Sequence, residues 1–376
     1  MIIGVPKEIK IRENRVAIVP GGVKMLTSNG HRVLIEKGAG VGAGISDGVY
    51  QESGATIVND VEELWGSAEM IIKVKEPIEA EYTRMQPGQI LYTYLHLAAE
   101  PALAKVLLQR QVRAIAYETI QLADGSLPLL RPMSEVAGRM AVQVGAQCLQ
   151  KHNGGKGILL GGVPGVRRGR VVILGGGVAG TNAAKMAIGL GAEVTIVDVN
   201  QSRLTYLDDI FGNQVTTLMS TPEIIERTVL ASDLLIGTVL VTGAKAPRVV
   251  SKDLVRRMEP GSVIVDVAID QGGCVETIRP TTHDDPIYFY EGISHYGVTN
   301  MPGDVPCTSA YALTNVTLSY ACDIANKGFD RAMRESAPLR LGLNTYEGEM
   351  THEVVAHALG YKRQDTSALF SQNVAV

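Results

Sequence analysis

The amino-acid sequence predicts an α/β fold built on open, mainly parallel sheets. Three observations support this prediction. Short runs rich in β-branched residues alternate with helix-like stretches in the first third of the chain, the alternation resumes after residue 169, and the later strands are apolar throughout. Alternating strands and helices are typical of parallel βαβ units. Continuously apolar strands are typical of a sheet that is covered on both faces.

The first 120 residues contain six short apolar runs, and we expect each to form a strand. These runs are residues 2–6, 31–37, 55–58, 70–75, 89–97 and 112–118. Between them, residues 20–30 and 61–70 carry apolar side chains at helical spacing. Gly30 is expected to stop the first of these helices, because glycine readily adopts the left-handed conformation that commonly follows a helix.

Residues 154–169 interrupt the alternation. Seven of these 16 residues are glycine, a density that no helix tolerates, so we expect a loop or arm. Five further strands are expected beyond it, at residues 170–174, 192–199, 214–219, 233–240 and 262–270. After Pro306 the pattern predicts one long helix that ends at Gly328, and residues 348–361 also have a helical pattern.

The composition limits the class of protein. A chain of 376 residues is long enough for two domains, and 45% hydrophobic with 20% charged residues is ordinary for a globular protein. The net charge of -4 and the lack of basic runs argue against electrostatic binding to nucleic acid or to an anionic membrane. The chain has no apolar run long enough to predict a membrane-spanning helix, no visible secretory signal and four scattered cysteines. We therefore expect a cytoplasmic protein.

The strongest motif is a Gly-x-Gly-x-x-Gly sequence formed by Gly175, Gly177 and Gly180. The pattern alone is weak in a glycine-rich chain, but its context supports it. An apolar strand leads into it, an alanine-rich helical stretch follows it, and a second strand ends on Asp198, 18 residues after Gly180. This arrangement is the fingerprint of a Rossmann domain that binds a dinucleotide.

Each residue of the motif has a physical role in such a domain. Gly175 permits a tight turn, Gly177 lets the backbone approach a pyrophosphate, and Gly180 lets the helix pack closely against the strand. The N-terminus of the helix presents unpaired N–H groups to the phosphates, and Asp198 can accept hydrogen bonds from ribose hydroxyls. The alternative is a Rossmann-like domain that no longer binds a nucleotide.

Four polar residues are candidates for substrate chemistry because each sits at or just beyond an apolar run, where loops leave the carboxyl edge of a sheet. They are Arg15, Lys75, His96 and Asp270. Taken singly, the first three also fit a solvated charge, a surface lysine and a core histidine. Asp270 is favoured because an acid that ends an apolar strand of a nucleotide domain lies close to the ligand crevice.

Together with the glycine motif, these sites resemble the alanine dehydrogenase and pyridine nucleotide transhydrogenase family. The resemblance runs in collinear order from Met1 to Tyr320 and is carried by MIIGVPKEIKIRENRVAIVP, IIKVKEP, YTYLHLA, RPMSEVAGRMAVQVGA, LGGGVAG, TIVDVN, VDVAIDQGG and HYGVTNMPGDVPCTSAYALTNVTLSY. These motifs are long rather than degenerate, and on their strength the sequence is identified as a member of this family.

The resemblance implies an NAD-dependent oxidoreductase that interconverts L-alanine with pyruvate and ammonium, normally as a homohexamer. It also implies two Rossmann-like domains with a cleft between them. The substrate domain would comprise residues 1–128 and 306–376. The central residues 129–305 would form a doubly wound NAD-binding domain.

The resemblance further implies a role for each candidate residue. Arg15 and Lys75 match the carboxylate-binding pair, which suits a planar guanidinium beside a point charge. His96 matches the general acid and base, and Asp270 the second catalytic residue, which orients the ammonium or the attacking water. The positions at which the family contacts NAD, beyond the three motif glycines, correspond to Ser134, Val178, Ala179, Asp198, Arg203, Ser220, Val239, Leu240, Val267, Arg279, Asn300 and Met301.

One departure from the family pattern is visible. Some members place a histidine four residues after the acid that corresponds to Asp323, and that pair is associated with a divalent metal. Here the position holds Lys327, so we expect no metal site. Two other functions stay open: the NAD-binding component of a proton-translocating transhydrogenase, and a non-catalytic NAD-sensing protein. The joint presence of Arg15, Lys75 and His96 favours the dehydrogenase reaction over both.

Overall fold

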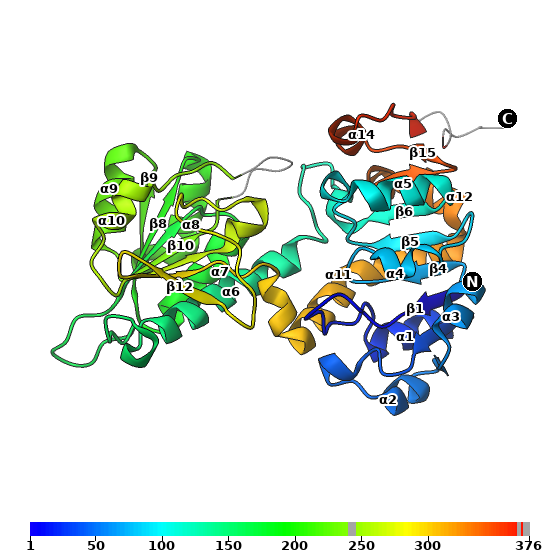
Figure 1. The fold of residues 1–376 in the computed structure, drawn as a ribbon, viewed down its shortest axis with the longest axis horizontal. Coiled ribbons are helices and arrows are strands. Elements are labelled where there is room, and N and C mark those ends of the chain that lie inside the picture. The colour runs from blue at the N-terminus through cyan, green and yellow to red at the C-terminus, as the bar shows by residue number, and fades with distance from the viewer. Residues whose placement is uncertain (240–245, 367–369, 371–376) are drawn as a thin grey trace. The chain divides into compact units, whose positions relative to one another are not determined.

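The computed structural model describes residues 1–239, 246–366 and 370. The chain divides into two compact units, one made of residues 1–133 and 303–376 and the other of residues 134–302 (Figure 1). Each unit is built on its own sheet, in which parallel pairing dominates. Among the described residues, no helix combines the length and apolar character needed to span a bilayer.

The sheet of the first unit has eight strands among the described residues, in the order β15-β14-β6-β5-β4-β1-β2-β3. They are β1 (Ile2–Val5), β2 (Arg32–Glu36), β3 (Thr56–Val58), β4 (Met70–Ile72), β5 (Ile90–Thr93), β6 (Arg113–Ala116), β14 (Leu343–Tyr346) and β15 (Glu349–Met350). Strands β1 to β6 pair in parallel, whereas β14 pairs antiparallel with β6. The strand order reverses at β1, between β2 and β4. In open α/β sheets, ligands bind beyond the carboxyl ends of the strands at such a reversal.

Helices cover this sheet, and the long one after Pro306 returns the chain to the first unit. The helices are α1 (Pro20–Ser28), α2 (Asp47–Glu52), α3 (Val61–Ser67), α4 (Glu79–Tyr82), α5 (Pro101–Gln109), α11 (Pro306–Lys327), α12 (Phe329–Glu335), α13 (Ala337–Gly342) and α14 (Glu353–Leu359). The α11 helix ends before Gly328, as the sequence predicts. The expected stop of α1 is also confirmed. Gly30 has a φ of 83°, and the N–H of His31 bonds the carbonyl of Leu26 at 3.2 Å.

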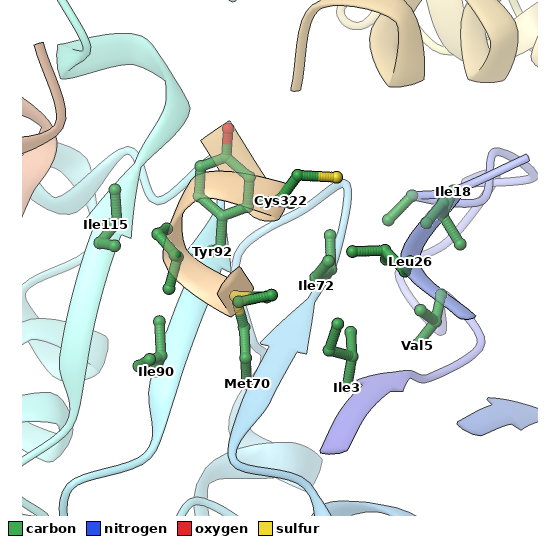
Figure 2. Close-up of a cluster of buried hydrophobic side chains, with 14 of the residues drawn as sticks. Ile3, Val5, Ile18, Leu26, Met70, Ile72, Ile90, Tyr92, Ile115 and Cys322 are labelled. Atoms are coloured by element: carbon green, nitrogen blue, oxygen red, sulfur yellow. The ribbon is translucent and has the colours of Figure 1, made fainter. Parts of the chain in front are cut away.

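The apolar runs of the first unit are continuous because both faces of its sheet are buried. In β4, Met70 and Ile72 belong to one buried cluster, whereas Ile71 between them belongs to another. Figure 2 shows the first of these clusters, in which Met70 and Tyr92 gather with Cys322 of α11. Successive side chains of a strand point to opposite faces, so a strand covered on both faces needs apolar residues at every position.

The sheet of the second unit has the order β12-β13-β11-β10-β7-β8-β9 among the described residues. Its strands are β7 (Arg170–Leu174), β8 (Glu193–Asp198), β9 (Val215–Met219), β10 (Leu234–Gly237), β11 (Val263–Asp266), β12 (Ile287–Tyr290) and β13 (Ile293–Tyr296). Only β12 pairs antiparallel, at the edge. Its helices are α7 (Val178–Gly189), α8 (Gln201–Phe211), α9 (Pro222–Ala231) and α10 (Lys252–Arg256), with α6 (Arg131–Cys148) crossing from the first unit. Here the strand order reverses at β7, between β8 and β10.

Several elements differ from the sequence prediction. The strand expected at residues 89–97 ends at Thr93, and Leu97 begins a 3-10 helix, η2 (Leu97–Ala99). The strand expected at residues 262–270 ends at Asp266, and Asp270 lies in a 3-10 helix, η6 (Val267–Gln271). The Asp266 side chain accepts the N–H of Ala268 and, further on, that of Cys274, and these bonds turn the chain out of the sheet. The expected helix at residues 348–361 begins instead as β15, because Glu349 and Met350 pair with β14.

The glycine-rich segment 154–169 contains no helix or strand, as expected; its only ladder is an isolated bridge between Val163 and Val166. Asp233, buried at the start of β10, holds both ends of this segment. Its carboxylate lies 3.0 Å from the ammonium of Lys156 and 2.7 Å from the Nη1 of Arg167, and it accepts the N–H of Arg170 at 2.8 Å. Burial alone would raise the pKa of Asp233, but these donors lower it to about 2.

We predict that Asp233→Asn destabilises the second unit in a pH-dependent manner. A pKa lowered below that of an unfolded aspartate, about 3.9, means that the carboxylate stabilises the fold fully above about pH 5 and loses this effect as the pH falls toward 2. Differential scanning calorimetry should show a Tm several degrees lower than that of the parent at pH 7. This gap should narrow between pH 5 and pH 3. A difference in Tm that stays constant down to pH 3 would contradict this role of the Asp233 carboxylate. So would an equal difference in Glu193→Gln, which removes an exposed ion pair with Arg170.

Candidate active site

Three of the four residues predicted to act on substrate lie beyond the carboxyl ends of neighbouring strands in the first unit. Arg15 follows β1, Lys75 follows β4 and His96 follows β5. Because β1, β4 and β5 are adjacent and parallel, these loops leave the same edge of the sheet, beside the reversal at β1. The first unit therefore gathers two cations and an imidazole at one edge.

The guanidinium of Arg15 is almost fully buried and held by a carboxylate. Its Nε lies 2.6 Å from Oε1 of Glu13 and its Nη2 lies 2.5 Å from Oε2, so the pair is bidentate. Its Nη1 also contacts the sulfur of Met133 at 3.1 Å. A planar fork held in this way has a fixed orientation toward any further acceptor.

Lys75 is the more weakly compensated cation. Among the described residues, no carboxylate lies within ion-pair distance of its ammonium. Burial lowers the pKa of Lys75, and the positive charge of Arg15 lowers it further. Two positive charges brought together in a partly buried place attract an anion, so this pair is suited to a carboxylate ligand.

His96 is held by its backbone and by one ring nitrogen. It has a φ of 49°, in the left-handed region, where its N–H bonds Oε1 of Glu118 at 2.6 Å. Its Nδ1 lies 3.0 Å from Oε2 of Glu76, and its ring stacks on that of Tyr94. The side chain is 42% exposed. The hydrogen bond at Nδ1 fixes the ring, which leaves Nε2 as the nitrogen that can exchange a proton with a ligand.

Glu76 is a site residue that the sequence analysis missed. Its carboxylate is 4% exposed and pairs with His96 and with the ammonium of Lys10. Burial raises the pKa of Glu76, but the hydrogen bond from His96 and the nearby positive charges outweigh burial and lower it to about 2. The carboxylate is thus ionised at neutral pH. Its position next to Lys75, in the run KVKEP, was the available signal.

In the second unit, the glycine motif forms the turn between β7 and α7. Gly175 has a φ of 98°, which side chains rarely permit. A Cβ on Gly180 would lie 1.9 Å from the carbonyl oxygen of Gly175, so only glycine allows the helix to pack this closely. Gly177 caps α7, is exposed, and has open space where its Cβ would be. The N-terminus of α7 is therefore accessible to a phosphate-bearing ligand.

Asp198 and Arg203 both contact the glycine turn. Oδ2 of Asp198 accepts the N–H of Gly176 at 2.6 Å. The Nε of Arg203 donates to the carbonyl of Gly176 at 2.5 Å, and its Nη2 donates to the hydroxyl of Thr181. Asp198 is half-buried at the end of β8 and retains acceptor capacity, since a carboxylate has about four lone-pair sites. The Nε and Nη2 groups of Arg203 are both engaged in hydrogen bonds to the turn and to the start of α7.

Most of the other residues expected to contact NAD follow the carboxyl ends of strands in the second unit. The described residues that do so are Ser220 after β9, Val239 after β10, Val267 after β11, and Asn300 and Met301 after β13. Ser220 also lines a surface hollow with Thr221, Ile225, Val249 and Leu254. Ser134 lies in α6, Val178 and Ala179 begin α7, and Arg279 stacks on the ring of Tyr288. Leu240 lies outside the described residues.

Asp270 belongs to the second unit and is exposed in η6. The acid that ends β11 is Asp266, whose carboxylate is buried and accepts backbone N–H groups of Ala268, Cys274 and Val275. Asp266 therefore shapes the loop that carries Asp270.

Asp323 and Lys327, where we expect no metal site, belong to a cluster of ion pairs. The ammonium of Lys327 lies 3.2 Å from Asp323 and 3.3 Å from Glu335. In the described part of the chain, no group of three or more histidine, cysteine, aspartate or glutamate side chains is arranged to hold a metal ion.

Known protein families and relatives match this chain over nearly its whole length. The family model described as "Alanine dehydrogenase/PNT, N-terminal domain" matches residues 4–137, and "Alanine dehydrogenase/PNT, C-terminal domain" matches residues 141–353. An alanine dehydrogenase from Methanococcus maripaludis is 61% identical over 359 residues, which cover 95% of this chain and 96% of the relative. An alanine dehydrogenase from Bacillus subtilis is 60% identical over 364 residues, which cover 96% of each chain.

Solved structures give the same result for the fold. A structure of L-alanine dehydrogenase matches with a TM-score of 0.94 and 52% identity, covering 96% of this chain and 99% of that one. A transhydrogenase from Sinorhizobium meliloti matches with a TM-score of 0.79 at 23% identity, covering 94% of this chain and 99% of that one, a likeness of fold alone. The prediction of two Rossmann-like domains is confirmed.

Proposed function

This chain belongs to the alanine dehydrogenase/PNT family, and from that premise we propose that it converts L-alanine to pyruvate and ammonium with NAD and catalyses the reverse reductive amination. As a member of this family at about 60% identity to curated alanine dehydrogenases, it is an oxidoreductase. We propose that the first unit binds the amino or oxo acid and that the second binds the cofactor.

The substrate carboxylate binds between Arg15 and Lys75. Arg15 offers a fork whose orientation is fixed by Glu13, and Lys75 adds a point charge whose pKa is lowered by burial and by the charge of Arg15. A carboxylate placed there relieves the repulsion between the two cations. The buried ammonium of Lys75, beside the fixed fork of Arg15, is the observation that carries the proposal, because it favours a small anionic substrate over a neutral one.

His96 moves the protons. Its Nδ1 is engaged by Glu76, so its Nε2 accepts a proton from the amine of alanine or from the water that adds to the imine. It returns a proton to nitrogen when ammonia leaves the carbinolamine. Glu76 stays ionised and stabilises the imidazolium that forms. Asp270 orients the ammonium group or the attacking water.

The second unit has residues that fit NAD. Its open Gly177 at the N-terminus of α7 accommodates a pyrophosphate, and Asp198 at the end of β8 offers acceptors to a ribose. NAD supplies the hydride acceptor that protein side chains lack. The homohexamer is likewise a proposal drawn from family membership, and the cytoplasmic location is a proposal drawn from the sequence.

An absorbance assay tests this function. Purified protein mixed with NAD and L-alanine should form NADH, and pyruvate with ammonium and NADH should consume it. The NAD-binding component of a transhydrogenase, or an NAD-sensing protein, would bind NAD without turnover of either mixture. D-Alanine serves as the control for a specific substrate site.

Glu76→Gln should lower kcat by tenfold or more while the affinity for NAD stays within about twofold. The amide cannot compensate a positive imidazole and can present its NH₂ to Nδ1, which disfavours the required tautomer. Steady-state kinetics with L-alanine, and NAD binding by calorimetry, measure the two quantities. Glu100→Gln on the same unit is the control. An unchanged kcat would remove Glu76 from the proton-transfer machinery.

The cofactor should be NAD rather than NADP, by at least about tenfold in kcat/KM. A 2′-phosphate beside Asp198 would bring two like charges together, which costs several kcal/mol. Arg203 directs its Nε and Nη2 to Gly176 and Thr181, so it would have to give up these bonds to grip a 2′-phosphate with that edge of its fork. Asp198→Ala should narrow the preference, and it should also weaken NAD binding because the bond to the Gly176 N–H is lost. Equal use of NADP by the parent, or an unchanged preference in the variant, would refute this reasoning.

A further inference from the structure

The loop that carries Lys75 and Glu76 has no secondary structure of its own. It runs from the end of β4 to the start of α4, through residues 73–78. Its two functional side chains must nevertheless stay in place: Lys75 beside Arg15, and Glu76 against His96. A loop with this task needs partners for its backbone from elsewhere in the unit.

Two buried carboxylates supply these partners at the two ends of the loop. At one end, Oε1 of Glu8 accepts the N–H of Val74 at 2.6 Å and that of Lys75 at 3.3 Å. At the other end, Oε2 of Glu81 accepts the N–H of Ile78 at 3.0 Å. Both carboxylates are at most 7% exposed. Backbone N–H groups bonded to carboxylates are held more strongly than in neutral hydrogen bonds.

Lys73 joins the two carboxylates. Its ammonium lies 3.1 Å from Oε2 of Glu8 and 2.9 Å from Oε1 of Glu81, and the whole residue is buried. Such a buried ionic group is weak evidence for stability, because its desolvation offsets the attraction, and well-packed apolar residues often stabilise a fold equally well. The role of this ionic group lies instead in the conformation that it specifies. Here that conformation is the path of the backbone from Val74 to Ile78.

Glu8 also ties the loop to the segment that carries the other cation. It stands in the stretch after β1 that includes Lys10, which pairs with Glu76, and Arg15. The hydroxyl of Thr93, at the end of β5, donates to the carbonyl of Lys75 at 3.0 Å and holds the other side of the same residue.

Resting on the proposed function, we propose that Glu8 is a positioning residue of this site: held by Lys73 and Glu81, it fixes the peptide of Lys75 and thereby the spacing of the two cations that receive the substrate carboxylate. The mechanism is the hydrogen bonding of Glu8 to the backbone, with Oε1 on the two N–H groups and Oε2 facing the ammonium of Lys73. Glutamine keeps one acceptor oxygen for the N–H groups, whereas alanine removes both acceptors.

The test compares Glu8→Ala with Glu8→Gln, and uses Glu62→Gln, which removes an exposed pair with Arg84, as the control. In Glu8→Ala, KM for L-alanine and for pyruvate should rise about tenfold or more, with NAD affinity unchanged. Hydrogen exchange at the amides of Val74 and Lys75 should accelerate in the ligand-free protein. Glu8→Gln, which keeps one acceptor oxygen for these N–H groups but turns its NH₂ toward the ammonium of Lys73, should give KM values and exchange rates between those of Glu8→Ala and those of the parent.

Two outcomes would overturn the proposal. One is a Glu8→Ala variant with a lower Tm but with unchanged KM values and unchanged hydrogen exchange. This result would show that Glu8 has a purely structural role. The other is a Glu8→Gln variant with KM values and exchange rates equal to those of Glu8→Ala, which would show that an acceptor at this position does not hold the loop. If Glu8→Ala does not fold, Thr93→Val replaces it and should raise the same KM values; unchanged values would again overturn the proposal. Lack of turnover by the parent would refute the proposed function, while the exchange measurement would still decide whether Glu8 holds the loop.

Discussion

His96→Ala should lower kcat for L-alanine oxidation by about 10²–10⁴-fold, the range that general acid–base catalysis contributes. The substitution removes the only ring at this edge whose Nδ1 is engaged by a buried carboxylate, within the described residues. It leaves the glycine turn and Asp198 of the second unit untouched. NAD affinity should therefore stay within about twofold of the parent value, and the loss should appear in kcat rather than in cofactor binding.

The control for this prediction is His357→Ala, which removes an exposed histidine of α14 in the same unit. It should leave kcat unchanged. In single-turnover experiments His96→Ala should slow proton-dependent steps in both reaction directions. Retention of more than about half of the parent kcat would show that His96 is not the general acid and base.

The features that sequence could predict are those fixed by neighbours along the chain. Gly30 ends α1 because its left-handed conformation lets the N–H of His31 reach Leu26, a contact within six residues. Gly175 and Gly180 are explained by the geometry of a single turn. The apolar runs predicted parallel strands because strands buried on both faces need apolar residues at every position.

The features that sequence could not predict depend on contacts between distant segments. Glu76 meets His96 only because β4 and β5 are adjacent, and Glu8 meets Lys73 only because β1 pairs with β4. The short apolar run 262–270 gave no sign that it would leave the sheet at Asp266. The reason lies in the hydrogen bonds that backbone N–H groups up to nine residues later donate to the carboxylate of Asp266. Local patterns place residues on elements but do not reveal which buried charges meet.

Asp270→Asn should lower kcat by at least about a hundredfold with little change in Tm. Asp270 is exposed on η6, and the interactions of exposed charges contribute little to stability. The amide keeps the size and loses the charge, which tests whether the residue must attract an ammonium group or accept a proton from water. Kinetics with L-alanine and calorimetric melting give the two readouts, and Asp253→Asn on exposed α10 is the matched control.

Asp266→Asn separates the role of Asp270 from that of the loop beneath it. The carboxylate of Asp266 accepts three backbone N–H groups, and an asparagine would turn its NH₂ toward at least one of them. This variant should therefore lower Tm and kcat together, because the loop that presents Asp270 loses its shape. If Asp270→Asn instead lowers Tm as much as Asp266→Asn, or keeps more than about half of the parent kcat, Asp270 belongs to the scaffold and the acid that orients the substrate must be sought elsewhere.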